Sequence, residues 1–283
     1  MAPVVLIISF ALLYRDVLTG LVADWMGDQN YSHGFLIVPL ALYFAWERRR
    51  ELAEAPGGPS IVGLFIALGS ISLLVAGVLG SEFFLTRVSM VGTIAGVVLF
   101  VLGPHHLRVL AFPLAFLLLM IPIPAIVFNQ IAFPLQLFAS WFGETALAVS
   151  GVPVLREGNL IVLTDTTLEV AEACSGIRSL VSLFTLGVVY AYFMESRTAI
   201  RVILACATVP IAIITNGCRI AGTGVAAQVY GSRAAEGFFH TFSGWLLFVM
   251  AFGLLFLLHR GLLVAAGWAQ RARISQGGAA RWA

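Results

Sequence analysis

The chain has 283 residues, of which 60% are hydrophobic and only 11% are charged, and its mean hydropathy is +0.99. A soluble domain is about half apolar and about a quarter charged, so this composition indicates a polytopic membrane protein. The net charge of +2 gives no indication of a nucleic-acid partner. Lysine is absent, which excludes a catalytic lysine, and three cysteines do not make a disulfide framework.

Apolar runs bounded by charges or turn residues predict an all-α protein with about eight transmembrane helices. Arginine is more frequent on the loops that would be cytoplasmic, ten residues against six, and this bias puts both termini inside. The whole chain, 1–283, is expected to form a single integral membrane domain, with 274–283 as a flexible cytoplasmic tail. The predicted spans are 3–22, 35–46, 61–80, 88–103, 107–124, 176–194, 201–218 and 243–258.

Two segments between the fifth and sixth predicted spans differ from the rest. Residues 126–150 are apolar but carry Asn129, Gln130, Gln136 and Glu144, so we expect a helix that lies in the outer interface or is partly re-entrant. Residues 151–170 alternate short β-branched runs with Gly, Asn and Asp, which is typical of a β-hairpin. Such a hairpin needs water or protein around its edges, so it is expected at the outer surface.

The predicted topology brings three reactive residues to the outer ends of three spans. Cys174 precedes the sixth span, Arg219 follows the seventh and His240 precedes the eighth. Each alone has an ordinary interpretation: a packed thiol, an arginine that reaches toward headgroups, or an interfacial histidine. Together they supply a thiol nucleophile, an oxyanion donor and a proton carrier, which are the groups that acyl transfer through a thioester requires.

Polar neighbours strengthen this hypothesis. Arg178 is four residues after Cys174 and shares its helical face, and a charge one turn inside a span usually marks a partner or a site. Asn216 shares a face with Arg219, and Glu172 lies beside the cysteine. An adjacent guanidinium favours the reactive thiolate over the thiol. The cysteines have no CxxC spacing and no phosphate-binding loop is found, so no metal or cofactor is expected.

The sequence resembles the exosortase/archaeosortase family of membrane cysteine transpeptidases in five motifs that follow one another in the same order as in the family. The motif "SHGFL" favours the bacterial exosortase branch. The five motifs are "YSHGFLIVPL" (31–40), "FLLLMIPIP" (116–124), "EACSGIRSL" (172–180), "NGCRIAG" (216–222) and "HTFSG" (240–244). The resemblance implies a nucleophile at Cys174, a catalytic arginine at Arg219 and a catalytic histidine at His240. For Arg178, Glu172 and Asn216 it implies supporting or substrate-binding roles.

The resemblance further implies an enzyme of the inner membrane with its active site at the outer face. Its partners would be exported proteins that bear a C-terminal PEP-CTERM-like sorting signal, membrane lipid and an unknown acceptor amine. Simple hydrolysis, with water in place of the amine, stays open. Two other classes also stay open: a membrane transporter, which predicts function without Cys174, and a non-catalytic scaffold for polysaccharide export, which predicts tolerance of substitution at all three positions.

Overall fold

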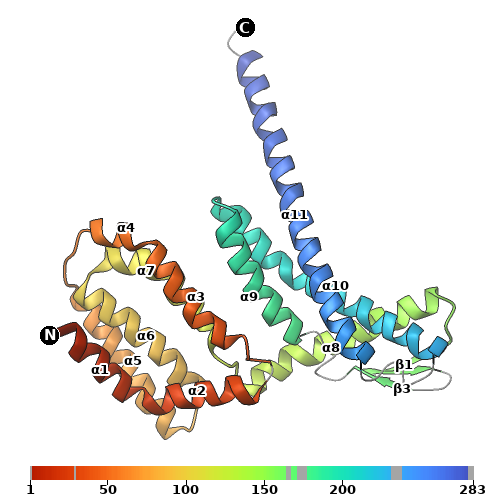
Figure 1. Cartoon of the computed structure of the whole chain (residues 1–283), viewed down its shortest axis with the longest axis horizontal. Coiled ribbons are helices and arrows are strands. Elements are labelled where there is room, and N and C mark those ends of the chain that lie inside the picture. Colours follow the sequence, from red (N-terminus) through yellow and green to blue (C-terminus); the bar gives the residue numbers. More distant parts are fainter. Residues whose placement is uncertain (1, 29, 164–166, 171–176, 231–237, 280–283) are drawn as a thin grey trace. The chain divides into compact units, whose positions relative to one another are not determined.

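The computed structural model describes residues 2–28, 30–163, 167–170, 177–230 and 238–279 (Figure 1). The chain forms two compact units, 1–127 and 128–283. The first contains α1 (Ala2–Leu13), α2 (Arg15–Gly27), α3 (Gly34–Glu47), α4 (Arg49–Glu54), α5 (Ile61–Leu79), α6 (Phe83–Val101), α7 (Pro104–Leu117) and the 3-10 turn η1 (Leu118–Met120). Helix α8 (Ala125–Val149) begins the second, followed by β1 (Val154–Glu157), β2 (Leu160–Leu163), β3 (Thr167–Glu169), α9 (Ile177–Met194), α10 (Thr198–Tyr230) and α11 (Phe238–Ala279).

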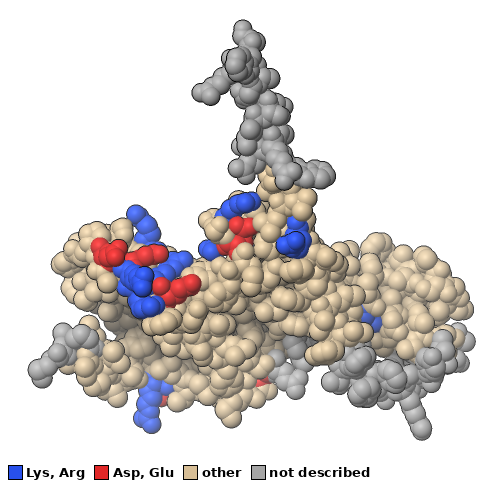
Figure 2. Space-filling view, turned by 45° about the horizontal axis from the view of Figure 1, so that its top comes forward, with Lys and Arg blue, Asp and Glu red and all other residues tan. Residues whose placement is uncertain are grey.

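Several of these helices are long and apolar enough to cross a membrane, so the chain is an integral membrane protein. Five qualify by length and composition among the described residues: α5, α6, α8, most of α10 and the middle of α11. The pair α1 and α2, bent by 64°, makes up to six. Figure 2 accordingly shows charged side chains gathered in a few groups between broad uncharged surfaces.

The predicted count of eight spans is not confirmed. Three predicted spans correspond to shorter apolar helices of 10–17 residues, at 34–47, 104–120 and 180–194. A helix rises 1.5 Å per residue, so these are short of the roughly 20 residues that cross a bilayer. The segment predicted to be an interfacial or partly re-entrant helix, 126–150, forms one unbroken helix of 25 residues, α8, which by length and composition counts among the five.

In the first unit, small residues let α5 and α6 pack closely. A β-carbon on Gly63 would collide with the backbone of Phe100, and one on Gly96 would lie 2.5 Å from the backbone nitrogen of Ala67. Transmembrane helices associate through such close approach of their backbones, since lipid supplies no hydrophobic driving force between them. The glycines in these apolar segments therefore position one helix against the next.

Two of the motifs that carry the family resemblance meet at one end of this unit. Trp25 donates a hydrogen bond from Nε1 to the carbonyl of Met120 (3.0 Å), and Nε2 of His33 lies 3.2 Å from the carbonyl of Leu119. These carbonyls belong to the turn after α7, where a helix end leaves acceptors without intrahelical partners. "SHG" and "LLLMIP" are thus joined by the His33 hydrogen bond across 86 positions of sequence, and Trp25, seven residues before "SHG", adds a second bond across 95 positions.

The predicted hairpin is confirmed and extended by a third strand. Strands β1, β2 and β3 are antiparallel in that order, and Gly158 takes a φ of +65° in the two-residue turn between β1 and β2. Residues of β2 alternate in burial, with Ile161 and Leu163 facing inward. They join a small core with Leu147 of α8 and Ile220 of α10. The sheet is therefore covered on one face by helices.

Helices α9, α10 and α11 form a three-helix bundle in which α10 runs opposite to the other two (Figure 1). Leu183, Ala212 and Ala251 make one core layer, one residue from each helix. Leu204 and Leu255 belong to a second layer further along. This direction puts the start of α9, the middle of α10 and the start of α11 at the same end of the bundle.

Candidate functional site

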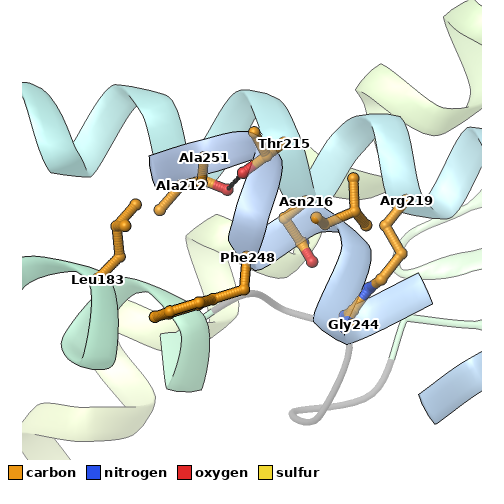
Figure 3. Close-up of a pocket in the computed structure, with 9 residues that line it drawn as sticks. Leu183, Ala212, Thr215, Asn216, Arg219, Gly244, Phe248 and Ala251 are labelled. Carbon is orange, nitrogen blue, oxygen red and sulfur yellow. Dashed lines mark hydrogen bonds between the residues drawn. The ribbon is translucent and has the colours of Figure 1, made fainter. Parts of the chain in front are cut away.

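A small pocket opens between the three helices near that end (Figure 3). It is lined by Leu183 from α9, by Asn216 and Arg219 from α10, and by Gly244 and Phe248 from α11. Its volume of about 20 Å³ has room for a single water molecule. At this pocket the polar side chains of α10 therefore lie close to α9 and α11.

The direction in which the polar face of α10 points is set by the packing of α10 against α8. Asn216 and Arg219, three residues apart, share one face, and Asn216 is buried. A β-carbon on the neighbouring Gly217 would collide with the ring of Phe142 in α8. Close packing on that side sets the rotation of α10 and so turns the polar pair toward the pocket.

Arg219 extends from α10 toward the first turns of α11 (Figure 3). Its Nη1 lies 4.0 Å from the position that a β-carbon on Gly244 would take. His240 is one helical turn before Gly244, and residues four apart share a helical face. The guanidinium therefore lies against the face of α11 on which position 240 falls.

The predicted site residues are described to different extents. Asn216 and Arg219 line the pocket with their side chains. The backbones of Arg178 and His240 lie in the first turns of α9 and α11, and their side chains are outside those that the structure describes. Cys174 and Glu172 lie outside the described residues. The roles of all six residues stay predictions.

A second polar cluster, which the sequence did not predict, lies at the other end of the bundle. His259 of α11 is buried, its Nδ1 lies 2.8 Å from Tyr190 Oη, and its Nε2 lies 3.6 Å from the carboxylate of Glu195. Arg201 donates to the backbone carbonyls of Glu195 and Tyr192. His259 is 15 residues from Gly244, about 22 Å along the helix, so this cluster is separate from the pocket.

No role was predicted for His259, because a lone histidine at a span boundary is ordinarily interfacial. The available signal was a carboxylate, Glu195, directly at the end of a predicted span. A buried carboxylate in such a place requires a partner.

One arginine of the β-sheet forms an ion pair with a helix. Arg156 of β1 donates from Nε to Glu144 of α8 over 2.8 Å, with each side chain about one third exposed. This ion pair links the sheet to α8.

Among the residues that the structure describes, no group of three or more His, Cys, Asp or Glu could hold a metal ion. Cys206 and Cys218 are free and exposed. The exposure of Cys206 differs from the packed position that a cysteine deep in an apolar span ordinarily takes.

A family model described as transmembrane exosortase matches residues 25–257. The chain belongs to the transmembrane exosortase family. Comparison with curated proteins and with solved structures finds no match. The matched range covers most of the exosortase chain, including positions 172–240 with all six predicted site residues, and it confirms the resemblance drawn from the five motifs. Exosortases are generally cysteine transpeptidases.

Proposed function

We propose that this exosortase is a membrane cysteine transpeptidase that cleaves C-terminal sorting signals of exported proteins at the outer face of the inner membrane. The observation that carries the proposal is the position of Arg219, whose guanidinium reaches from α10 to the α11 face that bears position 240. A cation fixed between helices in an apolar chain is costly and is expected at a site of function. The family match supports the same chemistry.

In the proposed first half-reaction, the thiolate sulfur of Cys174 attacks the carbonyl carbon of the scissile peptide and forms a C–S bond. Arg219 donates hydrogen bonds to the resulting oxyanion. When this intermediate collapses, the C–N bond breaks and His240 gives a proton to the leaving amine. The product is a thioester between Cys174 and the exported protein.

In the second half-reaction, an acceptor amine attacks the thioester carbon and His240 takes the proton of that amine. The C–S bond breaks and the Cys174 thiolate is regenerated, so protons and electrons balance over the cycle. Asn216 lies in the same pocket as Arg219 and would help to orient it. Glu172 and Arg178, near Cys174 in sequence, are the supporting residues expected to contact the signal.

The test is mass spectrometry of membranes that contain the exosortase and a signal-bearing substrate. Wild type should process the substrate and carry a substrate thioester on Cys174, whereas Cys174→Ala should abolish both. Cys218→Ala and Cys206→Ala are matched controls, since both thiols are exposed and should be dispensable. Processing that persists in Cys174→Ala would exclude the thioester mechanism and favour a transporter or scaffold.

Arg219 has its own test in the same assay. Arg219→Gln should reduce processing by about 100-fold or more, the effect typical of losing an oxyanion donor. Arg260→Gln is a control on α11, beyond the pocket and close to the second polar cluster. Equal activity of Arg219→Gln and Arg260→Gln would show that Arg219 takes no part in the reaction.

A further inference from the structure

Two cavities lie along one side of α6 in the first unit. The first, called the charged cavity, has a volume of about 340 Å³ and is bordered by α2, the turn after α5 and the start of α6. Its charged lining residues are Asp16, Asp24 and Arg87. The second, called the apolar cavity, has a volume of about 380 Å³ and lies between α1 and α6, with Phe10 and Val97 in its wall.

The two cavities follow a single face of α6. Thr86 and Arg87 border the charged cavity, and Ile94 and Val97 border the apolar one. Spacings of three, four and seven residues along a helix keep side chains on one face. About nine residues separate the centres of the two groups, which is about 13 Å of helix. One leaflet of the hydrocarbon core is about 15 Å thick, so the pair matches the depth of one lipid leaflet.

Tyr14 fixes the geometry between the two cavities. It is fully buried at the junction of α1 and α2, and its Oη lies 2.7 Å from Thr93 Oγ1 and 3.3 Å from Ser89 Oγ. The two helices bend by 64° at this junction. Because of this bend, α2 borders the charged cavity while α1 borders the apolar one. The hydrogen bonds of Tyr14 hold the junction of the two helices against α6.

The charges indicate the headgroup that would fit. Arg87 is buried and its Nη2 lies 2.6 Å from the carboxylate of Asp24, whose side chain is 42% exposed, while Asp16 is exposed. A guanidinium suits a phosphate, and carboxylates accept hydrogen bonds from an ammonium group. Two carboxylates and one guanidinium give the cavity a net charge of −1, which disfavours an anionic headgroup. A quaternary ammonium has no N–H to donate to the aspartates.

We propose that the two cavities together bind one phospholipid with a phosphate and a primary ammonium in its headgroup, of the phosphatidylethanolamine type. Its phosphate lies at Arg87, its ammonium at Asp16, and an acyl chain occupies the apolar cavity. The site belongs to the first unit alone and needs neither Cys174 nor cleavage, so it stands or falls separately from the proposed function.

The test is native mass spectrometry of the purified full-length protein with phosphatidylethanolamine, phosphatidylcholine and phosphatidylglycerol of identical acyl chains. Wild type should retain phosphatidylethanolamine about tenfold better than the other two, a difference of about 1.4 kcal/mol. Asp16→Asn should remove this preference. The substitution is mild, because Asp16 is exposed and the hydrogen bond at this residue runs from Thr19 to its backbone carbonyl. Glu54→Gln, an exposed acid on α4, should leave the preference unchanged.

The apolar cavity is tested by filling it. Val97→Trp should lower retention of all three lipids, whereas Val75→Trp on the exposed side of α5 should not. Equal retention of the three lipids by wild type, or an unchanged preference in Asp16→Asn, would overturn the proposal. So would a photo-crosslinker at position 94 that captures the apolar helix of a substrate in place of lipid.

Discussion

The Nη1 atom of Arg219 lies 4.0 Å from the point that a β-carbon on Gly244 would occupy. The absence of a side chain at 244 thus gives the guanidinium its place beside α11. A methyl group fits at ordinary contact distance, but a larger side chain would displace the guanidinium.

We expect Gly244→Ala to keep most of the processing activity and Gly244→Leu to lose about 100-fold, because the oxyanion donor would be moved. The measurement is processing of a signal-bearing substrate in membranes. Gly253→Leu is the matched control, since nothing lies within 4 Å of a β-carbon at that position of the same helix. Equal losses at 244 and 253 would show that the contact with Arg219 is not what matters.

The close approach of α5 to α6 predicts unequal effects of one substitution at two glycines. Gly63→Val would force a side chain into the backbone of Phe100, and overpacking of this kind costs about 1–3 kcal/mol. Gly69→Val in the same helix meets nothing within 4 Å and should be tolerated. Thermal unfolding of the purified protein compares the two. A midpoint lowered as much by Gly69→Val as by Gly63→Val would argue against this packing.

The joined motifs of the first unit depend on Gly34. A β-carbon there would collide with the indole of Trp25, which donates to Met120. Gly34→Ala should therefore lower the unfolding midpoint, and Trp25→Phe should cost about 1 kcal/mol through the lost hydrogen bond. Gly27→Ala is the control, because a β-carbon there meets no other atom within 4 Å. If Gly34→Ala were as stable as Gly27→Ala, the indole would have to lie elsewhere.

The lowered pKa of Glu195 predicts that the stability of the fold depends on pH. The backbone N–H of Arg197, 2.9 Å from Oε1, is the largest cause that holds the pKa of this carboxyl below its usual 4.5. Burial opposes it, while the N–H of Ser196 and the nearby His259 act in the same direction. A lowered folded-state pKa stabilises the fold above the unfolded-state pKa, and this stabilisation is lost as the pH falls through the folded-state value.

Glu195→Gln should therefore be less stable than wild type near pH 7, and the difference should shrink as the pH falls below about 4.5. Thermal unfolding across pH 3–7 measures this. The exposed Glu157→Gln serves as the control and should not show the same trend. A gap between Glu195→Gln and wild type that is constant with pH would contradict the assignment.

The pair Arg156 and Glu144 should contribute little to stability, since both side chains are about one third exposed. Pairs of this kind contribute about 0–1 kcal/mol. Arg156→Gln, Glu144→Gln and the double variant form a double-mutant cycle, read by thermal unfolding. Non-additive effects that weaken with added salt are expected. Strictly additive effects would mean that the two charges do not interact.

Patterns of neighbouring residues in the sequence predicted much of the fold and of the candidate site. Runs of apolar residues identified the membrane protein, and the alternation in 151–170 identified the hairpin that the structure contains. The motifs around Arg219 and His240 identified the family that the match over 25–257 shows. Each of these signals lies within a few dozen neighbouring residues, so the sequence alone could carry it.

The predicted count of eight spans is not confirmed, and the reason is physical. Hydropathy measures how apolar a run is, but it does not give the residue at which a helix ends. The breaks around α3, at the turn after α7 and at Tyr14 are set by contacts such as Trp25 with Met120, between residues 95 positions apart.

Sequence by itself therefore determined the class of protein, its family and the residue types at the candidate site, because these depend on local composition and order. Only the tertiary structure decided that Arg219 lies against Gly244, that Glu195 is close to His259, and that Asp24 pairs with Arg87. These pairs join helices that are far apart in the chain. They form because packing of small and apolar residues fixes how each helix is rotated against its neighbours.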